Sequence, residues 1–88
     1  MRIRRGHELG LTEARIRIDR VTAELERRYS MRSSWDGDHV VVRGNDVSGR
    51  IVISHNYVEA HIRLGLTLVL FERQIRSGIL AAMDEHLR

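Results

Sequence analysis

The sequence lacks several features that small proteins use for stability or for export. It contains no cysteine, which excludes a disulfide framework and a thiolate metal site. It contains no proline, as expected for a chain that is nearly all regular structure. Its longest apolar stretch, residues 64–71, is far shorter than the roughly 18 residues that span a bilayer, and its charged beginning lacks the apolar segment of a signal peptide. We therefore expect a soluble, cytoplasmic protein without a transmembrane segment.

Lysine is also missing, so all the basic residues are arginine. Lysine and arginine together number 15, against 12 acidic residues, and the formal net charge is +3. Along residues 13–28 the arginines alternate with acidic residues, a pattern typical of a solvated helix face rather than of a basic patch. This pattern disfavours nucleic acid as a partner but leaves an acidic partner open, because arginine forms bidentate contacts with carboxylates and phosphates. A chain of 88 residues fits one domain, residues 1–88.

Two segments carry apolar residues at helical spacing. The first helix is predicted over residues 12–29, with Thr12 as the N-cap whose hydroxyl accepts a backbone N–H. The second is predicted from Thr67 to the end of the sequence. The apolar stripes are Ala14, Ile18, Val21, Leu25 and Tyr29 in the first helix, and Phe71, Ile75, Ile79, Met83 and Leu87 in the second. Gly78, beside the second stripe, indicates that a neighbouring element approaches closely.

Between the two helices the apolar period becomes two, which predicts strands. Asp36 and Gly37 form the turn of a hairpin, and a longer glycine-bounded connection, residues 44–49, precedes the next strand. Asn56 then turns the chain into a strand over residues 57–65. With a short first strand at the beginning, the order is β-α-β-β-β-β-α. We expect an α+β fold, a two-layer sandwich in which both helices cover one face of an antiparallel sheet.

Residues 7–15 form the joint between the first strand and the first helix. We expect the edge strand to end at Gly10, the leucines on either side of that glycine to enter the core, and Thr12 to cap the helix. His7 ties this corner through a hydrogen bond in this interpretation. Its action as a base is the alternative.

No catalytic, metal or cofactor site is indicated. The five histidines show none of the HxxxH or HExxH spacings of metal sites. The serines lack the GxSxG context of a nucleophile, and the glycines of residues 44–49 lack the lysine of a phosphate-binding loop. We therefore expect a protein that is not an enzyme and carries no cofactor.

The uncovered face of the sheet is the candidate interaction surface. In the register that we favour it carries Val41, Arg43, Arg50, Val52, Glu59, His61 and Arg63; the alternate register remains open. Such a face suggests contact with a partner, a second subunit or an acidic surface. Trp35 is included as either a partly buried anchor or an exposed docking residue. The apolar residues 64–71 are expected to be mostly core, with the remainder free to touch a lipid-like or polymer surface.

Several stretches resemble the polyhydroxyalkanoic acid system family, small bacterial proteins encoded near the genes of polyhydroxyalkanoate storage granules. These stretches are "RIRRGHELGLTEARIRID", "RYSMRSSWDGD", "DVSGRIVIS", "RLGLTLVLFERQI" and "MDEHL", which together span nearly the whole chain. Asp46 departs from the family pattern, in which glycine is expected before the valine. The resemblance implies an association with polyester storage and supplies no catalytic residues.

The inferred topology is similar to the TATA-binding-protein-like or helix-grip arrangement, although a fold alone does not determine a function. Our leading hypothesis is a non-catalytic accessory or binding protein of the polyhydroxyalkanoate system. Through the open sheet face it would contact a granule-associated protein, the granule surface or a second copy of itself as a homodimer. The alternative is a small carrier that holds an acyl chain or another apolar ligand between the C-terminal helix and the sheet.

Overall fold

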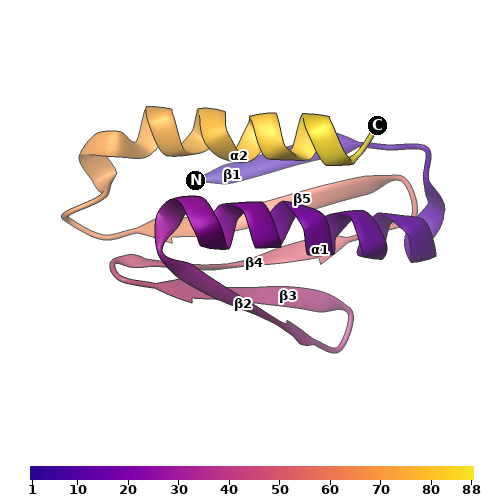
Figure 1. Ribbon diagram of the computed structural model, residues 1–88, viewed down its shortest axis with the longest axis horizontal. Helices are drawn as coiled ribbons and strands as arrows, with labels where there is room; N and C mark the ends of the chain where they lie inside the picture. The colour runs from indigo at the N-terminus through magenta and orange to yellow at the C-terminus, as the bar shows by residue number, and fades with distance from the viewer.

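A computed structural model describes residues 1–88 of the chain. Its five strands form one antiparallel sheet, and its two long helices lie on the same face of that sheet (Figure 1). The elements are β1 (Arg2–Gly6), α1 (Gly10–Tyr29), β2 (Met31–Asp36), β3 (His39–Gly44), β4 (Val47–Ile53), β5 (Tyr57–Leu64), the short 3₁₀ helix η1 (Val69–Phe71) and α2 (Glu72–His86). The predicted order of elements and the α+β architecture are confirmed.

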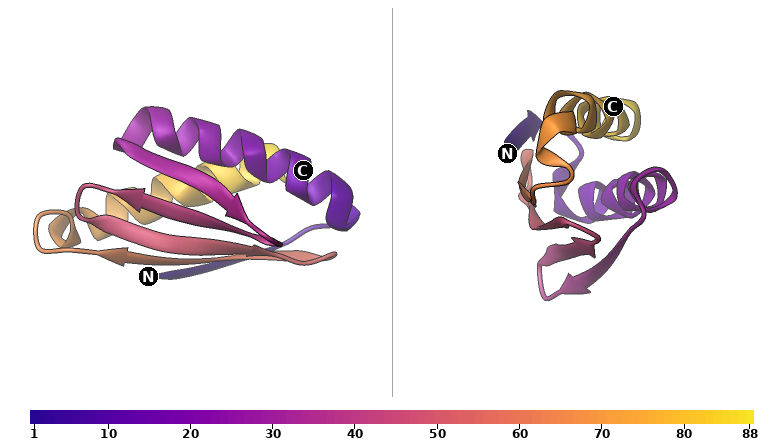
Figure 2. Two further views of the ribbon diagram at one scale, coloured as in Figure 1. Left: turned by 90° about the horizontal axis from the view of Figure 1, so that it is seen from below. Right: turned by 90° about the vertical axis from the view of Figure 1, so that its left-hand side faces the viewer.

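The strands lie side by side in the order β1, β5, β4, β3, β2. Strands β2 to β5 form the predicted meander, since each pairs with the next along the chain, and β1 forms the far edge by pairing with β5. Figure 2 shows α1 and α2 stacked on one face of the sheet, while no element covers the opposite face. We call that opposite face the open face.

Alternation along the strands decides which residues enter the core. In β3, Val40 and Val42 face the helices and are at most 1% exposed, whereas Val41 between them faces outward. The helices meet this inner face with their predicted stripes, of which Ala14, Ile18, Val21, Leu25, Ile75, Ile79, Met83 and Leu87 are buried. A slip of one residue would move the apolar set of a strand to the solvent side, so burial fixes the register.

His7 ties the corner between β1 and α1, as predicted. Its Nε2 lies 2.9 Å from the backbone oxygen of Ser54, and its Nδ1 accepts the backbone N–H of Leu9 at 3.1 Å. Because Nδ1 accepts, the ring proton belongs on Nε2, which donates to Ser54. The histidine is buried, and these two bonds give it a structural role.

The boundaries at this corner differ from the prediction. Strand β1 ends at Gly6, and α1 already begins at Gly10, where a φ of 77° turns the chain into the helix. Leu9 occupies the N-cap position without a side-chain cap, so Thr12 lies inside the first turn and does not cap the helix. Leu9 packs against the core as expected, but Leu11 is 44% exposed because the earlier start of the helix places it on the outer side.

Two hairpin loops differ from the prediction, the one between β2 and β3 in position and the one between β3 and β4 in length. Residues 37–38 form the loop between β2 and β3, with Gly37 at a φ of 66°, so that Asp36 is still part of β2. Residues 45–46 alone join β3 to β4, which corrects the longer connection that was expected. Gly49 lies inside β4, where a Cβ would overlap a backbone oxygen of β5. This glycine marks a close approach of two strands rather than a loop.

The second helix begins later than predicted. Residues 65–68 form a loop, η1 follows, and α2 begins only at Glu72. The prediction for Gly78 is confirmed, because a Cβ at that position would overlap the hydroxyl of Tyr29 at the end of α1. The glycine therefore lets α2 lie close to the last turn of α1.

Candidate functional site

The open face collects most of the residues that were predicted for an interaction surface. Strand pairing arranges them in rows, because directly opposed residues of neighbouring strands share a face of the sheet. The rows are Val41, Arg50 and His61; Val52 and Glu59; and Arg43 and Arg63 on either side of Ser48. These residues thus lie together on one surface, in the first of the two registers considered.

Arg32 extends the last of these rows and was missing from the prediction. It lies on β2 directly opposite Arg43 on β3, and both residues are exposed. The arginines that form ion pairs in this structure are Arg2, Arg4, Arg5 and Arg17. No ion pair is formed by Arg32, Arg43, Arg50 or Arg63. We call these four residues the arginine face. Alternation along β2 was the signal for Arg32, since residues 31, 33 and 35 turn toward the helices.

Glu59 lies in the row with Val52, and the charge of its carboxylate is neutralised within the sheet. Its oxygens lie 2.8 Å from Nε of Arg2, 3.5 Å from Nη1 of Arg4 and 2.9 Å from Nε2 of His61. The hydrogen bond from Arg2 is the main cause that lowers the pKa of Glu59 below its ordinary value, and the charges of Arg2, His61 and Arg4 add to it against the opposing effect of desolvation. The Arg4 guanidinium also lies 4.0 Å from the centre of the Tyr57 ring. Glu59 therefore has no free charge to offset the arginine face.

Trp35 does not share this surface. Its indole Nε1 donates to Oδ1 of Asp19 on α1 at 2.8 Å, and the guanidinium of Arg15 lies 4.7 Å from the ring centre. The side chain is half-buried on the helix side of β2 and packs against the core. Of the two alternatives, the structure places Trp35 as a partly buried anchor between α1 and β2.

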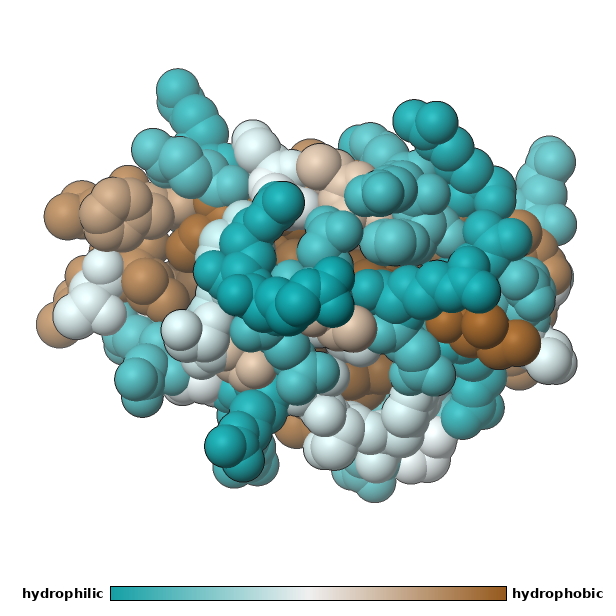
Figure 3. Space-filling view, viewed as in Figure 1, coloured by the Kyte–Doolittle hydropathy of each residue, from teal (hydrophilic) through white to brown (hydrophobic).

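The apolar residues before α2 are mostly exposed, which corrects the expectation that they belong to the core. Leu66 is 91% exposed, Leu70 84%, Phe71 53% and Val69 45%. Figure 3 shows apolar side chains gathered at the end of the molecule where η1 lies. Leu64 and Leu68 alone of the leucines in this stretch pack against the core. We call the exposed residues Leu66, Val69, Leu70 and Phe71 the apolar knuckle.

Asp46 holds the loop that carries the apolar knuckle. Its carboxylate accepts hydrogen bonds from the backbone N–H and the hydroxyl of Thr67, and a longer one from the backbone N–H of Leu68 at 3.3 Å. The hydroxyl of Thr67 is the main cause that lowers the pKa of Asp46, and the two backbone N–H groups lower it further, although desolvation opposes them. With a φ of 63°, Asp46 adopts the left-handed conformation for which the family pattern suggested glycine.

A cavity of about 440 Å³ lies between the sheet and the two helices. Its wall is mostly apolar and includes Leu25 of α1, Ile51 of β4 and Ile79 of α2. The polar residues of the lining include Arg28 in the last turn of α1 and Thr67 in the loop between β5 and η1. Small-molecule pockets of proteins have volumes of roughly 300–1,000 Å³ and a similar mixture of apolar wall and few polar groups. The cavity therefore has the size and lining of a ligand site.

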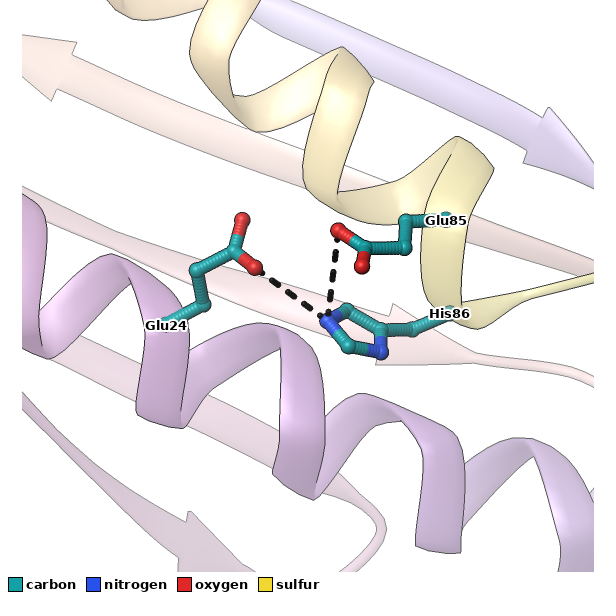
Figure 4. A group of neighbouring side chains, drawn as sticks. All are labelled: Glu24, Glu85 and His86. Carbon is teal, nitrogen blue, oxygen red and sulfur yellow. Dashed lines mark hydrogen bonds and ion pairs between the residues drawn. The ribbon is translucent and has the colours of Figure 1, made fainter.

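A third group joins the two helices near the end of the chain. Glu24 of α1 and Glu85 and His86 of α2 place potential metal-ligating atoms within 4.8 Å of one another (Figure 4). Nε2 of His86 lies 3.3 Å from Oε1 of Glu24 and 4.0 Å from Oε2 of the exposed Glu85. The geometry is that of an interhelical contact between His86 and Glu24. Sequence spacing could not reveal it, since these two residues are 62 positions apart.

The chain matches one known protein family over nearly its whole length. The family model described as "Putative polyhydroxyalkanoic acid system protein" matches residues 1–87. No curated protein and no solved structure matches. Neither α1 nor α2 combines the length and the apolar composition that crossing a membrane requires.

Proposed function

We propose that this protein, which belongs to the polyhydroxyalkanoic acid system family, is a non-catalytic binding protein. Its open face docks on an acidic surface of a granule-associated protein. The family connects the chain with storage polyester, and the open face supplies the means of contact. A cytoplasmic site of action is part of this proposal.

The observation that supports docking is the pairing of Arg32 with Arg43. Like charges directly opposite each other on neighbouring strands destabilise a sheet, so folding alone gives no reason for this arrangement. Arg63 continues the same row beyond Ser48. A partner that presents carboxylates opposite this row would relieve the repulsion and accept hydrogen bonds from the guanidinium groups.

Co-sedimentation with purified polyhydroxyalkanoate granules tests the proposal. We expect the protein to sediment with granules that carry their native proteins, to be released as salt rises, and to stay in the supernatant when granules have been stripped of protein. Arg43→Glu and Arg63→Glu should abolish sedimentation, because each places a negative charge in the contact. Arg20→Glu is the matched control, since Arg20 is an exposed arginine on α1 and has no ion pair.

Three results would contradict the proposal. Equal binding to stripped granules would assign the contact to the polymer surface instead of a protein. Loss of binding in Arg20→Glu as well as in Arg43→Glu would show a dependence on net charge rather than on the open face. A parent protein that forms a dimer in sedimentation equilibrium, broken by Arg43→Glu, would make a second copy the occupant of this face.

The cavity favours a second candidate function, the transport or storage of a small apolar ligand between the helices and the sheet. The volume and the mostly apolar lining of the cavity support this function. Thermal unfolding in the presence of acyl compounds tests this function, because a ligand that binds only the folded state raises the unfolding temperature progressively with its concentration. A flat response across acyl compounds rejects it.

A further inference from the structure

The cavity has a polar corner where α1 ends. Arg28 and Tyr29, the last two residues of α1, both line the cavity. Arg28 is exposed and has no ion pair, and the Tyr29 hydroxyl has no hydrogen-bond partner within the protein. We propose that the cavity binds an acyl chain with a free carboxylate, whose chain lies along the apolar wall and whose carboxylate is held by Arg28 and Tyr29. This inference rests on the second candidate function and specifies its ligand.

Gly78 brings the two donors together. A Cβ at Gly78 would overlap the hydroxyl of Tyr29 and would lie 3.5 Å from Nη1 of Arg28. Both donors are therefore adjacent to the same point on α2, within a distance that one carboxylate can bridge. An arginine and a hydroxyl are suited to a carboxylate, because a charge-assisted hydrogen bond from a guanidinium is stronger than a bond between neutral groups.

The preceding residue provides an internal comparison. Arg27 and Arg28 both lie in the last turn of α1, where a positive charge stabilises the negative end of the helix. Both are exposed, but only Arg28 lines the cavity. A role in the helix alone would make the two arginines equivalent, whereas a role in ligand binding distinguishes them.

The volume limits the length of the chain. A methylene group needs about as much space as a water molecule, whose share of liquid volume is roughly 30 Å³. A cavity of about 440 Å³ then holds on the order of ten to fifteen non-hydrogen atoms, which corresponds to a medium-length fatty acid. Each methylene buried in the wall should tighten binding about fourfold until the cavity is full.

Isothermal titration of the intact protein with two homologous series tests the inference. The series are the fatty acids hexanoate to dodecanoate and the primary alcohols of the same lengths. We expect the affinity for the acids to rise about fourfold per methylene and to level off near decanoate. Arg28→Gln should weaken decanoate about tenfold and leave decanol unchanged, while Arg27→Gln should alter neither. Leu68→Trp, which enlarges a side chain of the cavity wall, should prevent binding of both series.

Each other outcome has a defined meaning. If alcohols bind as tightly as acids, or if Arg28→Gln and Arg27→Gln behave alike, the assignment of the carboxylate to Arg28 and Tyr29 is wrong although the carrier function stands. If neither series binds, the carrier function fails together with this inference. If Leu68→Trp is folded by circular dichroism and still binds decanoate, the ligand lies elsewhere and the cavity is not its site.

Discussion

Replacing Arg43 by glutamate should make the protein more stable while it removes docking. Arg43 lies directly opposite Arg32, and such cross-strand pairs contribute roughly 0.2–1 kcal/mol, unfavourable for like charges and favourable for opposite charges. Reversal of one charge removes the penalty and adds the gain, which together amount to about 1 kcal/mol at low salt. Arg63 lies two strands from Arg43, about 10 Å away, and adds a smaller attraction when screening is weak.

Urea and thermal unfolding of the parent, Arg43→Gln and Arg43→Glu measure this effect. For a domain of this size a gain of about 1 kcal/mol raises the unfolding temperature by about 4–8 °C. Arg43→Gln, which removes only the repulsion, should give about half of the gain. At roughly 0.5 M salt, where the Debye length is only a few ångströms, most of the difference should vanish because the pair is exposed.

Two results would refute the reasoning. One is a parent protein at least as stable as both variants at low salt, which would mean that the guanidinium groups avoid each other at no detectable free energy. The other is a gain that persists undiminished in high salt, which would assign it to packing or strand propensity rather than to charge. The same proteins in the granule assay then show whether stability and docking change in opposite directions.

Three further predictions concern contacts that hold the fold. Folding lowers the pKa of Asp46, so the contribution of this residue to stability is complete above its ordinary pKa and is lost as pH falls through the lowered value. Asp46→Asn should therefore reduce the free energy of unfolding near neutral pH, and in urea titrations the difference from the parent should disappear between roughly pH 5 and pH 2. A difference that stays constant with pH would exclude the hydrogen bond from Thr67 as its cause. Trp35→Ala should lower the free energy of unfolding by about 2 kcal/mol, through lost packing and the bond to Asp19, and leave granule sedimentation intact; loss of sedimentation in a folded variant would place the indole in the docking surface. Gly49→Ala should lower it by more than about 2 kcal/mol, because the added Cβ overlaps a backbone oxygen of β5, and an unchanged urea midpoint would contradict this close approach.

Periodicity predicted the elements and the open face because it is a local property that burial enforces. The alternation of Val58, Ala60 and Ile62 with Glu59 and His61 assigned each side chain of β5 to one face before any contact was known. The corner at His7 was predicted for a similar reason, since the change of period between residues 6 and 12 leaves few ways to join a strand to a helix.

Turn lengths and contacts between residues far apart in the sequence were harder to predict. Trp35 turns toward α1 because the loop of β2 and β3 begins at Gly37, and this register sets the face of every residue in β2. Arg32 joins the open face for the same reason. Thr12 failed as a cap because the helix starts two residues earlier, at a glycine whose positive φ makes the turn without a side-chain cap.

The sequence by itself determined the helices, the meander, their order and the apolar residues that each helix and strand buries, because apolar spacing along the chain records which side of each element is buried. Only the tertiary structure decided the exposure of Leu66 and Phe71, the pairing of Arg32 with Arg43, and the cavity beside Arg28. The physical reason is distance along the chain. An exposed loop and a buried helix turn can use the same residues. Here the loop is held by hydrogen bonds that Asp46 accepts from Thr67, which lies 21 positions further along the chain. A cavity is the space that all the surrounding elements leave unfilled, so no single segment of the sequence encodes it.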